Sequence, residues 1–208
     1  MILKFYQQHI FPHLLNQVMQ VPSLMQPRGK LLSSIQGECL EIGFGTGINL
    51  NFYQNISKLY ALEPSNALWD LAQERLEHCP FAIEQLKAGA ENIPLADQSL
   101  SHVVSTWTMC SIAPLDQALK EIHRVLKTDG TFHFVEHVLS DDKSIQRWQN
   151  RLNPIQKTLA DGCNLNRDIE GILKRNGFEF IEKSYFNAHG VPKIGYRMLL
   201  GRVKKISS

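Results

Sequence analysis

A cluster of glycines around position 45 is the first group in the sequence whose type and spacing favour ligand chemistry. Gly43, Gly45 and Gly47 lie between a predicted strand and a helix-like segment. Glycine allows the backbone to pass close to a ligand, and in open α/β sheets ligands bind beyond the carboxyl ends of the strands. The spacing differs from the dinucleotide fingerprint, because Ile48 takes the place of its third glycine, and no lysine follows as in a phosphate-binding loop. The cluster therefore predicts a nucleotide-like ligand that is not bound through a phosphate group.

Two acidic residues beside the glycines narrow the choice of ligand. Glu41 precedes them, and a carboxylate there would repel a pyrophosphate but attract a ligand that carries an ammonium and a sulfonium. Glu63 ends the second predicted strand, where a carboxylate can accept hydrogen bonds from both ribose hydroxyls; its alternative role is to cap the helix that begins near Ser65. S-adenosylmethionine has these groups and no phosphate. We therefore predict it as the cofactor, with S-adenosylhomocysteine as the product.

The apolar runs of the sequence predict the scaffold that would position these residues. Strands and helices alternate along most of the chain, and this order is typical of a parallel sheet with helices on both faces. A loop without a helix joins the last two predicted strands, so a hairpin should make one edge strand antiparallel. The fold class that we expect is α/β, a Rossmann-like doubly wound sheet of about seven strands, mostly parallel. The predicted strands cover residues 39–42, 59–62, 81–86, 103–105, 131–138, 178–185 and 195–203, and predicted helices begin near 65 and cover 115–127, 143–159 and 167–175.

The segment before the first strand is the part least tied to this sheet. We predict residues 35–208 as the ligand-binding domain and residues 1–34 as a helical lid, because residues 1–20 place apolar side chains at helical spacing. Such an apolar face needs a cover, and a lid over the carboxyl edge would exclude water while admitting substrate. Two alternatives stay open: a brace packed permanently on the flank of the sheet, and a peripheral contact with a membrane surface.

Three motifs resemble those of the class I S-adenosylmethionine-dependent methyltransferases. Residues 40–47 resemble the first motif of that family, residues 62–65 the second, and residues 89–95 the segment that borders the adenine. Gly89 stands where many relatives have an aspartate. Thr106 and Trp107 fall where relatives line the methionine end of the cofactor. The resemblance implies that residues 35–208 form a methyltransferase domain whose cofactor-binding residues are Glu41, Gly43, Phe44, Gly45, Gly47, Asn49, Glu63, Pro64, Ala90, Glu91, Thr106 and Trp107.

The second half of the chain resembles a narrower group, the methyltransferase-like 7 thiol S-methyltransferases and their bacterial relatives. Thr106 with residues 110–111, residues 136–138 and residues 161–165 carry this resemblance. It implies methyl transfer to a small thiol. The animal members of the group begin with a hydrophobic membrane anchor, which we do not expect here, because the sequence has no apolar run of about 18 residues.

Methylation of a thiol requires loss of the thiol proton, which small thiols release at about pH 8–9. His137 is the first candidate for the base, because it follows the fifth predicted strand at the ligand edge, and Asp161 is the second. Their alternative roles are a buried structural histidine and the C-terminal turn of a helix. The sequence has four cysteines and no CxxC pair, so we predict neither a metal site nor a disulfide framework and assign Cys110 and Cys163 to the core.

Charge and composition limit the partners of the protein. A formal net charge of +2 does not indicate nucleic-acid binding, and residues 105–108 lack the Asn/Asp-Pro-Pro-aromatic turn of base methyltransferases. We therefore predict a small-molecule methyl acceptor, and the cysteine usage indicates a cytoplasmic location. A quinone- or phospholipid-type acceptor, a non-catalytic S-adenosylmethionine-binding protein and a nicotinamide oxidoreductase are the alternatives. No oligomeric state is predicted.

Overall fold

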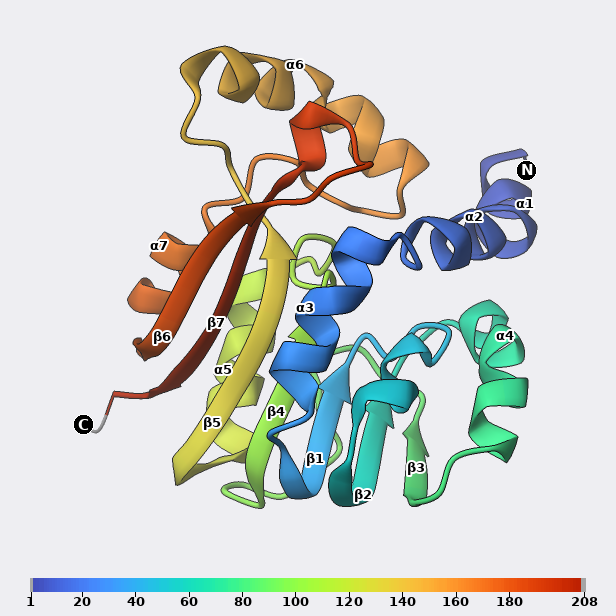
Figure 1. The fold of residues 1–208 in the computed structure, drawn as a ribbon, viewed down its shortest axis with the longest axis vertical. Coiled ribbons are helices and arrows are strands. Elements are labelled where there is room, and N and C mark those ends of the chain that lie inside the picture. Colours follow the sequence, from blue (N-terminus) through green and yellow to red (C-terminus); the bar gives the residue numbers. More distant parts are fainter. Residues whose placement is uncertain (1, 207–208) are drawn as a thin grey trace.

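A seven-stranded sheet forms the centre of the computed structural model, which describes residues 2–206 (Figure 1). The strand order is β3-β2-β1-β4-β5-β7-β6. Neighbouring strands are parallel except at β7, which is antiparallel to both β5 and β6. The mostly parallel sheet of about seven strands is thereby confirmed, while residue 1 of the predicted lid and residues 207–208 of the predicted domain lie outside the described residues. The strands are β1 (Gln36–Ile42), β2 (Asn55–Leu62), β3 (Ala82–Leu86), β4 (Leu100–Thr106), β5 (Leu126–His137), β6 (Phe178–Asn187) and β7 (Arg197–Lys205).

The antiparallel strand lies one place inside the edge of the sheet. β6 and β7 form the expected antiparallel pair, and β7 then pairs with β5, so β6 becomes the edge strand. The burial of the two strands explains this order. Most residues of β7 are buried, including Leu199 and Val203, whereas most residues of β6 are exposed. A strand with an apolar run is stabilised by two neighbours, and a polar strand tolerates the edge.

Helices cover both faces of the sheet, as predicted. One face carries an apolar core to which α5 (Leu115–Val125) and α7 (Ile169–Arg175) contribute, and the other carries a core shared with α4 (Asn66–Glu77) and the end of α3 (Pro22–Leu32). α6 (Lys143–Leu159) lies beyond the carboxyl ends of the strands, at the top of Figure 1. Two 3-10 turns complete the pattern, η1 (Ile48–Phe52) directly after the glycines and η2 (Lys193–Gly195) before β7.

Several predicted boundaries differ by a few residues from the structure, and the one between α5 and β5 needs a physical explanation. α5 ends at Val125, before the predicted residue 127, and β5 already begins at Leu126. Leu126 is fully buried and pairs with Leu100 of β4. Asp129 and Gly130 are typical of a helix end, and their position led to a predicted helix that continues to residue 127. Burial of Leu126 in the sheet outweighs this local preference, so the strand begins earlier.

The N-terminal segment begins with two short helices, α1 (Ile2–His9) and α2 (Phe11–Val18). Pro12 lies in the first turn of α2, where its missing N–H group breaks no helical hydrogen bond. Leu31 and Leu32, at the end of α3, belong to the core on the sheet. α1 and α2 instead lie beyond the carboxyl ends of the strands (Figure 1). Among the described residues, no helix is both long and apolar enough to cross a membrane.

Candidate active site

A cavity of about 730 Å³ opens at the carboxyl ends of the parallel strands. Its volume is in the ordinary range for small-molecule sites. Both predicted catalytic residues, His137 and Asp161, line it. All predicted cofactor residues except Gly47 line it too: Glu41, Gly43, Phe44, Gly45, Asn49, Glu63, Pro64, Ala90, Glu91, Thr106 and Trp107. We name the part around the glycine loop, Glu41 and Glu63 the glycine end, and the part around Trp107 and His137 the histidine end.

The glycines of the loop are required for two different structural reasons. Gly43, Gly45 and Gly47 all have positive φ angles, of 68°, 59° and 75°. A side chain at Gly43 would collide with Thr108, in the turn after β4. A Cβ at Gly45 would lie no nearer than 3.8 Å to its surroundings. Gly43 therefore allows two chain segments to pack, and Gly45 keeps backbone exposed to the cavity, where a ligand can approach it.

Gly47, which does not line the cavity, closes the loop from behind. It is the residue before η1, and a Cβ there would lie 3.0 Å from the Phe44 ring. Phe44 in turn stacks on Trp69 of α4, with ring centroids 4.9 Å apart. Gly47 thus shapes the loop rather than facing a ligand.

Glu63 follows β2 and holds the glycine loop to the start of α4. Its carboxylate accepts hydrogen bonds from the backbone N–H of Gly45 (3.1 Å) and of Ser65 (2.9 Å). The N-cap of α4 is the Ser65 hydroxyl itself, which accepts from Leu68. Burial raises the pKa of Glu63, and the two backbone hydrogen bonds oppose this rise. The geometry leaves Glu63 as a buried acceptor at the wall of the cavity.

Glu41, at the end of β1, is the centre of a buried polar network. Asn49 donates to one of its oxygens (2.9 Å) and the Tyr53 hydroxyl to the other (2.8 Å). Burial raises the pKa of Glu41 to about 7, against the effect of the Tyr53 and Asn49 hydrogen bonds and of the nearby Arg28 charge. A second positive charge in the cavity would therefore stabilise the ionised form of Glu41.

Arg28, on α3, is a site residue that the sequence motifs did not predict. Its side chain is buried, donates to Asn49 (2.8 Å), and lies over the Trp107 ring at 4.5 Å from the centroid. Its position in the sequence could have indicated this role. Arg28 lies at helical spacing from Leu24 and Leu31, which places its charge on a buried face of the helix. Arg28 links the N-terminal segment to both ends of the cavity.

The segment that borders the adenine in relatives departs from their pattern at Gly89. A side chain at this position would collide with the carboxylate of Glu91. Glu91 therefore occupies the space that a larger residue at 89 would fill. Ala90 is buried and Glu91 is exposed beside it.

The histidine end contains the last residue of β5. His137 is buried, and its Nε2 lies 2.8 Å from the carbonyl oxygen of Asn164. Burial lowers the pKa of His137, but its contacts with Cys163 and with the Asn164 carbonyl more than offset this and raise it. Asp161 lies nearer the surface, in the turn after α6, and accepts a hydrogen bond from Gln7 of α1 (3.3 Å). Both alternatives considered for these residues, a buried histidine and a helix-end turn, describe their surroundings correctly.

Cys110 is buried, as the predicted core position requires, and Cys163 is half-buried. Both also line the histidine end, which their assignment to the core did not predict. Their side chains come from the turn after β4 and from the loop after α6, so no local spacing connects them. They meet because both segments pack at the end of β5.

The first two helices cover the cavity between α6 and the glycine loop. The Tyr6 hydroxyl donates to the carbonyl of Leu159 (3.0 Å), and the Thr46 hydroxyl donates to Asn16 (2.8 Å). Residues of α1 and α2 that line the cavity include Tyr6, Phe11, Leu14, Leu15 and Val18. The segment is thus both a wall and a cover of the cavity.

Comparisons with known proteins agree with this geometry. Residues 40–134 match the model of a methyltransferase domain. The chain is 32% identical to the human thiol S-methyltransferase TMT1A over 168 residues, which are 78% of this chain and 66% of that protein. It is 37% identical to TMT1B of Rattus norvegicus over 148 residues, 69% of this chain and 60% of that protein. A ubiquinone/menaquinone biosynthesis C-methyltransferase, UbiE of Campylobacter jejuni, is 30% identical over 104 residues, 46% of this chain and 43% of that protein. The chain spans about two thirds or less of the length of these curated relatives.

Solved structures share the fold at low sequence identity. A chain from the complex between the Haloferax volcanii Trm112 methyltransferase activator and a methyltransferase has a TM-score of 0.72 at 13% identity, covering 99% of this chain and 97% of that one. The [4+2]-cyclase SpnF has a TM-score of 0.68 at 16% identity, covering 89% and 80%. A cyclase among these neighbours illustrates that the fold does not determine the reaction. The matched domain and the curated relatives nevertheless establish the family: the chain belongs to the class I S-adenosylmethionine-dependent methyltransferases and is a relative of the thiol S-methyltransferases.

Proposed function

We propose that this protein transfers the methyl group of S-adenosylmethionine to the sulfur of a small thiol. The observation that carries the proposal is the arrangement of one cavity, with buried acids and open glycine backbone at one end and His137 with apolar walls at the other. The thiol acceptor is suggested by the relatives TMT1A and TMT1B.

The glycine end fits the cofactor by the chemistry of its groups. S-adenosylmethionine, when bound, supplies a methyl group on a positively charged sulfonium. Glu63 would accept hydrogen bonds from the ribose hydroxyls, and the open backbone at Gly45 would allow close approach. Glu41, with its pKa near neutral, would be held in the ionised form by the positive charges of the ligand. Ala90 and Glu91 would border the adenine, and Asn49, Thr106 and Trp107 the methionine part.

The histidine end would hold the acceptor. Apolar side chains of α2 and its C-cap, of η2 and of β7 wall it, among them Leu14, Met19, Ile194 and Met198, and they would exclude water from the sulfur. His137 lies deeper than Asp161 and is the better placed of the two to promote loss of the thiol proton. Transfer is then an in-line displacement in which the main task of the chain is to position both partners.

A methyl-release assay over a panel of thiols, phenols and amines tests the proposal. We expect S-methylated product and S-adenosylhomocysteine with at least one small aliphatic or aromatic thiol. His137→Gln should lower kcat by about 100-fold without weakening S-adenosylmethionine binding. Turnover of phenols or amines with no thiol accepted would contradict the thiol assignment. Cofactor binding without turnover on any class would favour a non-catalytic binding protein.

A quinone-type acceptor is the second candidate, and one observation favours it. UbiE, a C-methyltransferase of quinone biosynthesis, is among the relatives, and a large apolar cavity would also accept a quinone ring. The same assay with a short-chain demethylated quinol separates the two. Methylation at carbon, faster than at any thiol, would replace the first proposal.

A further inference from the structure

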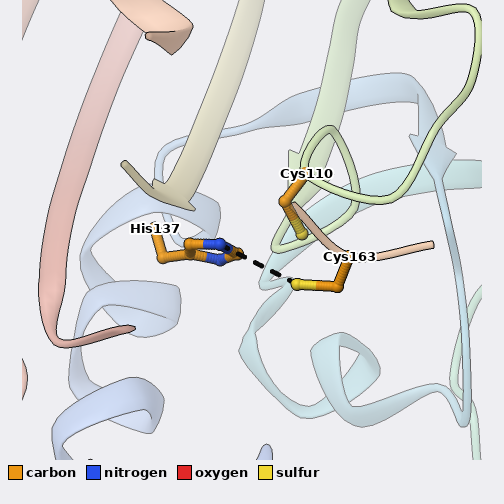
Figure 2. Close-up of side chains that lie close together, drawn as sticks. All are labelled: Cys110, His137 and Cys163. Carbon is orange, nitrogen blue, oxygen red and sulfur yellow. Dashed lines mark hydrogen bonds between the residues drawn. The ribbon is translucent and has the colours of Figure 1, made fainter. Parts of the chain in front are cut away.

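We propose that Cys110, His137 and Cys163 bind one zinc ion, whose fourth coordination position opens into the histidine end of the cavity and takes the acceptor thiol. Figure 2 shows the three side chains facing one another from three separate segments. One ligand atom of each, two Sγ and an imidazole nitrogen, lies within 4.8 Å of the other two. The inference rests on the proposed function, because a thiol acceptor gives the open position its role.

The spacing of the three atoms is close to that of a zinc site. Zinc bonds to cysteine sulfur at about 2.3 Å and to histidine nitrogen at about 2.0 Å, so two ligand atoms on a tetrahedral ion lie ~3.5–3.8 Å apart. The Cys163 Sγ already lies 3.8 Å from Nε2 of His137. Shifts of about 1 Å or less in the side chains would bring all three into the coordination sphere. Two thiolates with one imidazole form a soft donor set, which favours zinc over magnesium or calcium.

Hydrogen bonds hold the three segments in this arrangement. The buried carboxylate of Glu136, next to His137 on β5, accepts from two backbone N–H groups of the turn that carries Cys110 (2.7 and 2.8 Å). Asn164, next to Cys163, donates both its backbone N–H and its side-chain amide to the carbonyl of Cys110 (2.9 Å each). The ligands are therefore fixed by their neighbours in the chain, as a preorganised metal site requires.

The orientation of His137 and the local charges are compatible with an ion. Nε2 of His137 now makes a 2.8 Å hydrogen bond to the carbonyl of Asn164. Zinc would replace the proton and break this hydrogen bond, and a small turn of the ring toward the Cys163 sulfur, 3.8 Å away, would direct Nε2 to the ion. Arg167 donates to the carbonyls of Met109 and Ile112, on either side of Cys110. Two thiolates, the Glu136 carboxylate, the Arg167 guanidinium and a divalent ion together have no net charge. This neutrality lowers the free-energy cost of burying the charged groups.

All three ligands line the cavity, so the fourth position faces the proposed acceptor. Catalytic zinc sites have three protein ligands and one open position. A thiol that coordinates there loses its proton to solvent. Its sulfur then forms the new bond to the methyl carbon while the carbon–sulfur bond of the donor breaks, and S-adenosylhomocysteine leaves. In this form His137 acts through the ion and does not itself accept the proton.

Metal content is the first test. The full chain, reduced and incubated with Zn²⁺ alone, should retain about one zinc per chain after gel filtration, measured by elemental analysis. Cys110→Ser and Cys163→Ser should each lower the affinity for zinc by more than about 100-fold, because each removes an atom that would bind the ion directly. Cys79→Ser is the matched control, because Cys79 is half-buried and lies outside the cluster, and it should retain zinc fully. Thermal unfolding checks that each variant is folded. Retention that survives in folded Cys110→Ser and Cys163→Ser, or failure of the reduced wild-type protein to retain zinc, would overturn the proposal.

Cobalt substitution tests the open position without relying on activity. Co²⁺ in the wild type should give thiolate-to-metal absorption bands, and a small thiol should change them in the absence of S-adenosylmethionine. Protein treated with a chelator should lose thiol methylation and regain it with Zn²⁺. Full transfer by zinc-free protein would overturn the inference and leave the proposed function intact. Zinc bound through the three residues, with a thiol-induced spectral change but no thiol methylation, would overturn the proposed function and keep the metal site.

Discussion

The glycine end and the histidine end of the cavity are built in different ways. Two short stretches, residues 41–49 and 63–65, provide most of the polar groups of the glycine end, each at the end of a parallel strand. The histidine end combines side chains from α1, α2, the turn after β4, the end of β5, the loop after α6 and η2. The first is therefore a local product of strand order, and the second depends on how distant segments pack.

The same difference suggests how the two ends work. Backbone amides and buried acids at the glycine end are held by hydrogen bonds of 3.1 Å or less, which is typical of a preformed ligand site. The histidine end is closed by short helices whose outward faces expose apolar side chains such as Leu3 and Phe5. We infer that substitutions at the glycine end change cofactor affinity, and that changes to the cover of the histidine end act on transfer.

Gly45→Val should have the largest effect. A valine at φ 59° is strained, and its side chain would fill the open space beside the glycine loop. We expect S-adenosylmethionine affinity to fall by at least about 1,000-fold, or ~4 kcal/mol, in isothermal titration calorimetry. Gly37→Val is the matched control, because Gly37 also has a positive φ, of 72°, with open space around it but lies outside the cavity lining. Equal losses in both variants would mean that backbone strain, and not ligand contact, is responsible.

Deletion of residues 1–20 should come next and should affect the other end. α3 and its core contacts remain, so we expect the truncated chain to fold and to bind S-adenosylmethionine within about tenfold of the wild type. Transfer to the acceptor should fall by about 100-fold or more, because water enters the histidine end. Melting temperature, cofactor affinity and kcat/KM are measured together. Parallel losses of melting temperature and affinity would identify the segment as a brace, and full activity would leave a membrane- or partner-docking role.

Glu63→Ala should weaken cofactor binding by roughly tenfold to a hundredfold. The variant removes a charged acceptor for two hydroxyls, a loss of about 1.5–3 kcal/mol. Glu38→Ala serves as the control, since Glu38 is an exposed acid on β1 that does not line the cavity. Unchanged affinity in folded Glu63→Ala would remove this residue from the site and reduce the glycine end to backbone contacts.

The smallest effect should be a pH dependence of cofactor affinity. Glu41 has a pKa of about 7 in the protein without ligand, so below that pH most molecules carry a neutral carboxyl. A positively charged ligand prefers the carboxylate, and affinity should rise about tenfold between pH 6 and pH 8. Stability of the free protein should change in the opposite direction: an acid whose folded pKa is raised binds its proton more tightly in the folded state, so its contribution declines as pH rises from 4.5 through 7. Glu41→Gln should flatten both curves, and an unaltered slope in that variant would assign the effect to another group.

Much of the fold and of the glycine end was predictable from the residues. Apolar runs and their spacing placed the strands, the helices on both faces and the final hairpin, because burial on one or two faces leaves a period in the sequence. The glycine loop, Glu41 and Glu63 were predictable because the ends of neighbouring parallel strands meet at one edge. These features depend on short segments and on a strand order that few topologies allow.

Packing between distant segments decided the rest. The place of β7 inside the edge, the end of α5 at Val125 and the insertion of Arg28 between Asn49 and Trp107 follow from which side chains are buried. Cys110 and Cys163 carry no mutual spacing, and they meet at His137 because hydrogen bonds from Asn164 and to Glu136 hold two loops against the end of β5. Sequence patterns report the surroundings of a residue within its own helix or strand, whereas contacts between loops depend on the whole folded chain. For this reason the acids and glycines of the site could be predicted from the sequence, whereas the cluster of two thiols and an imidazole was found only in the tertiary structure.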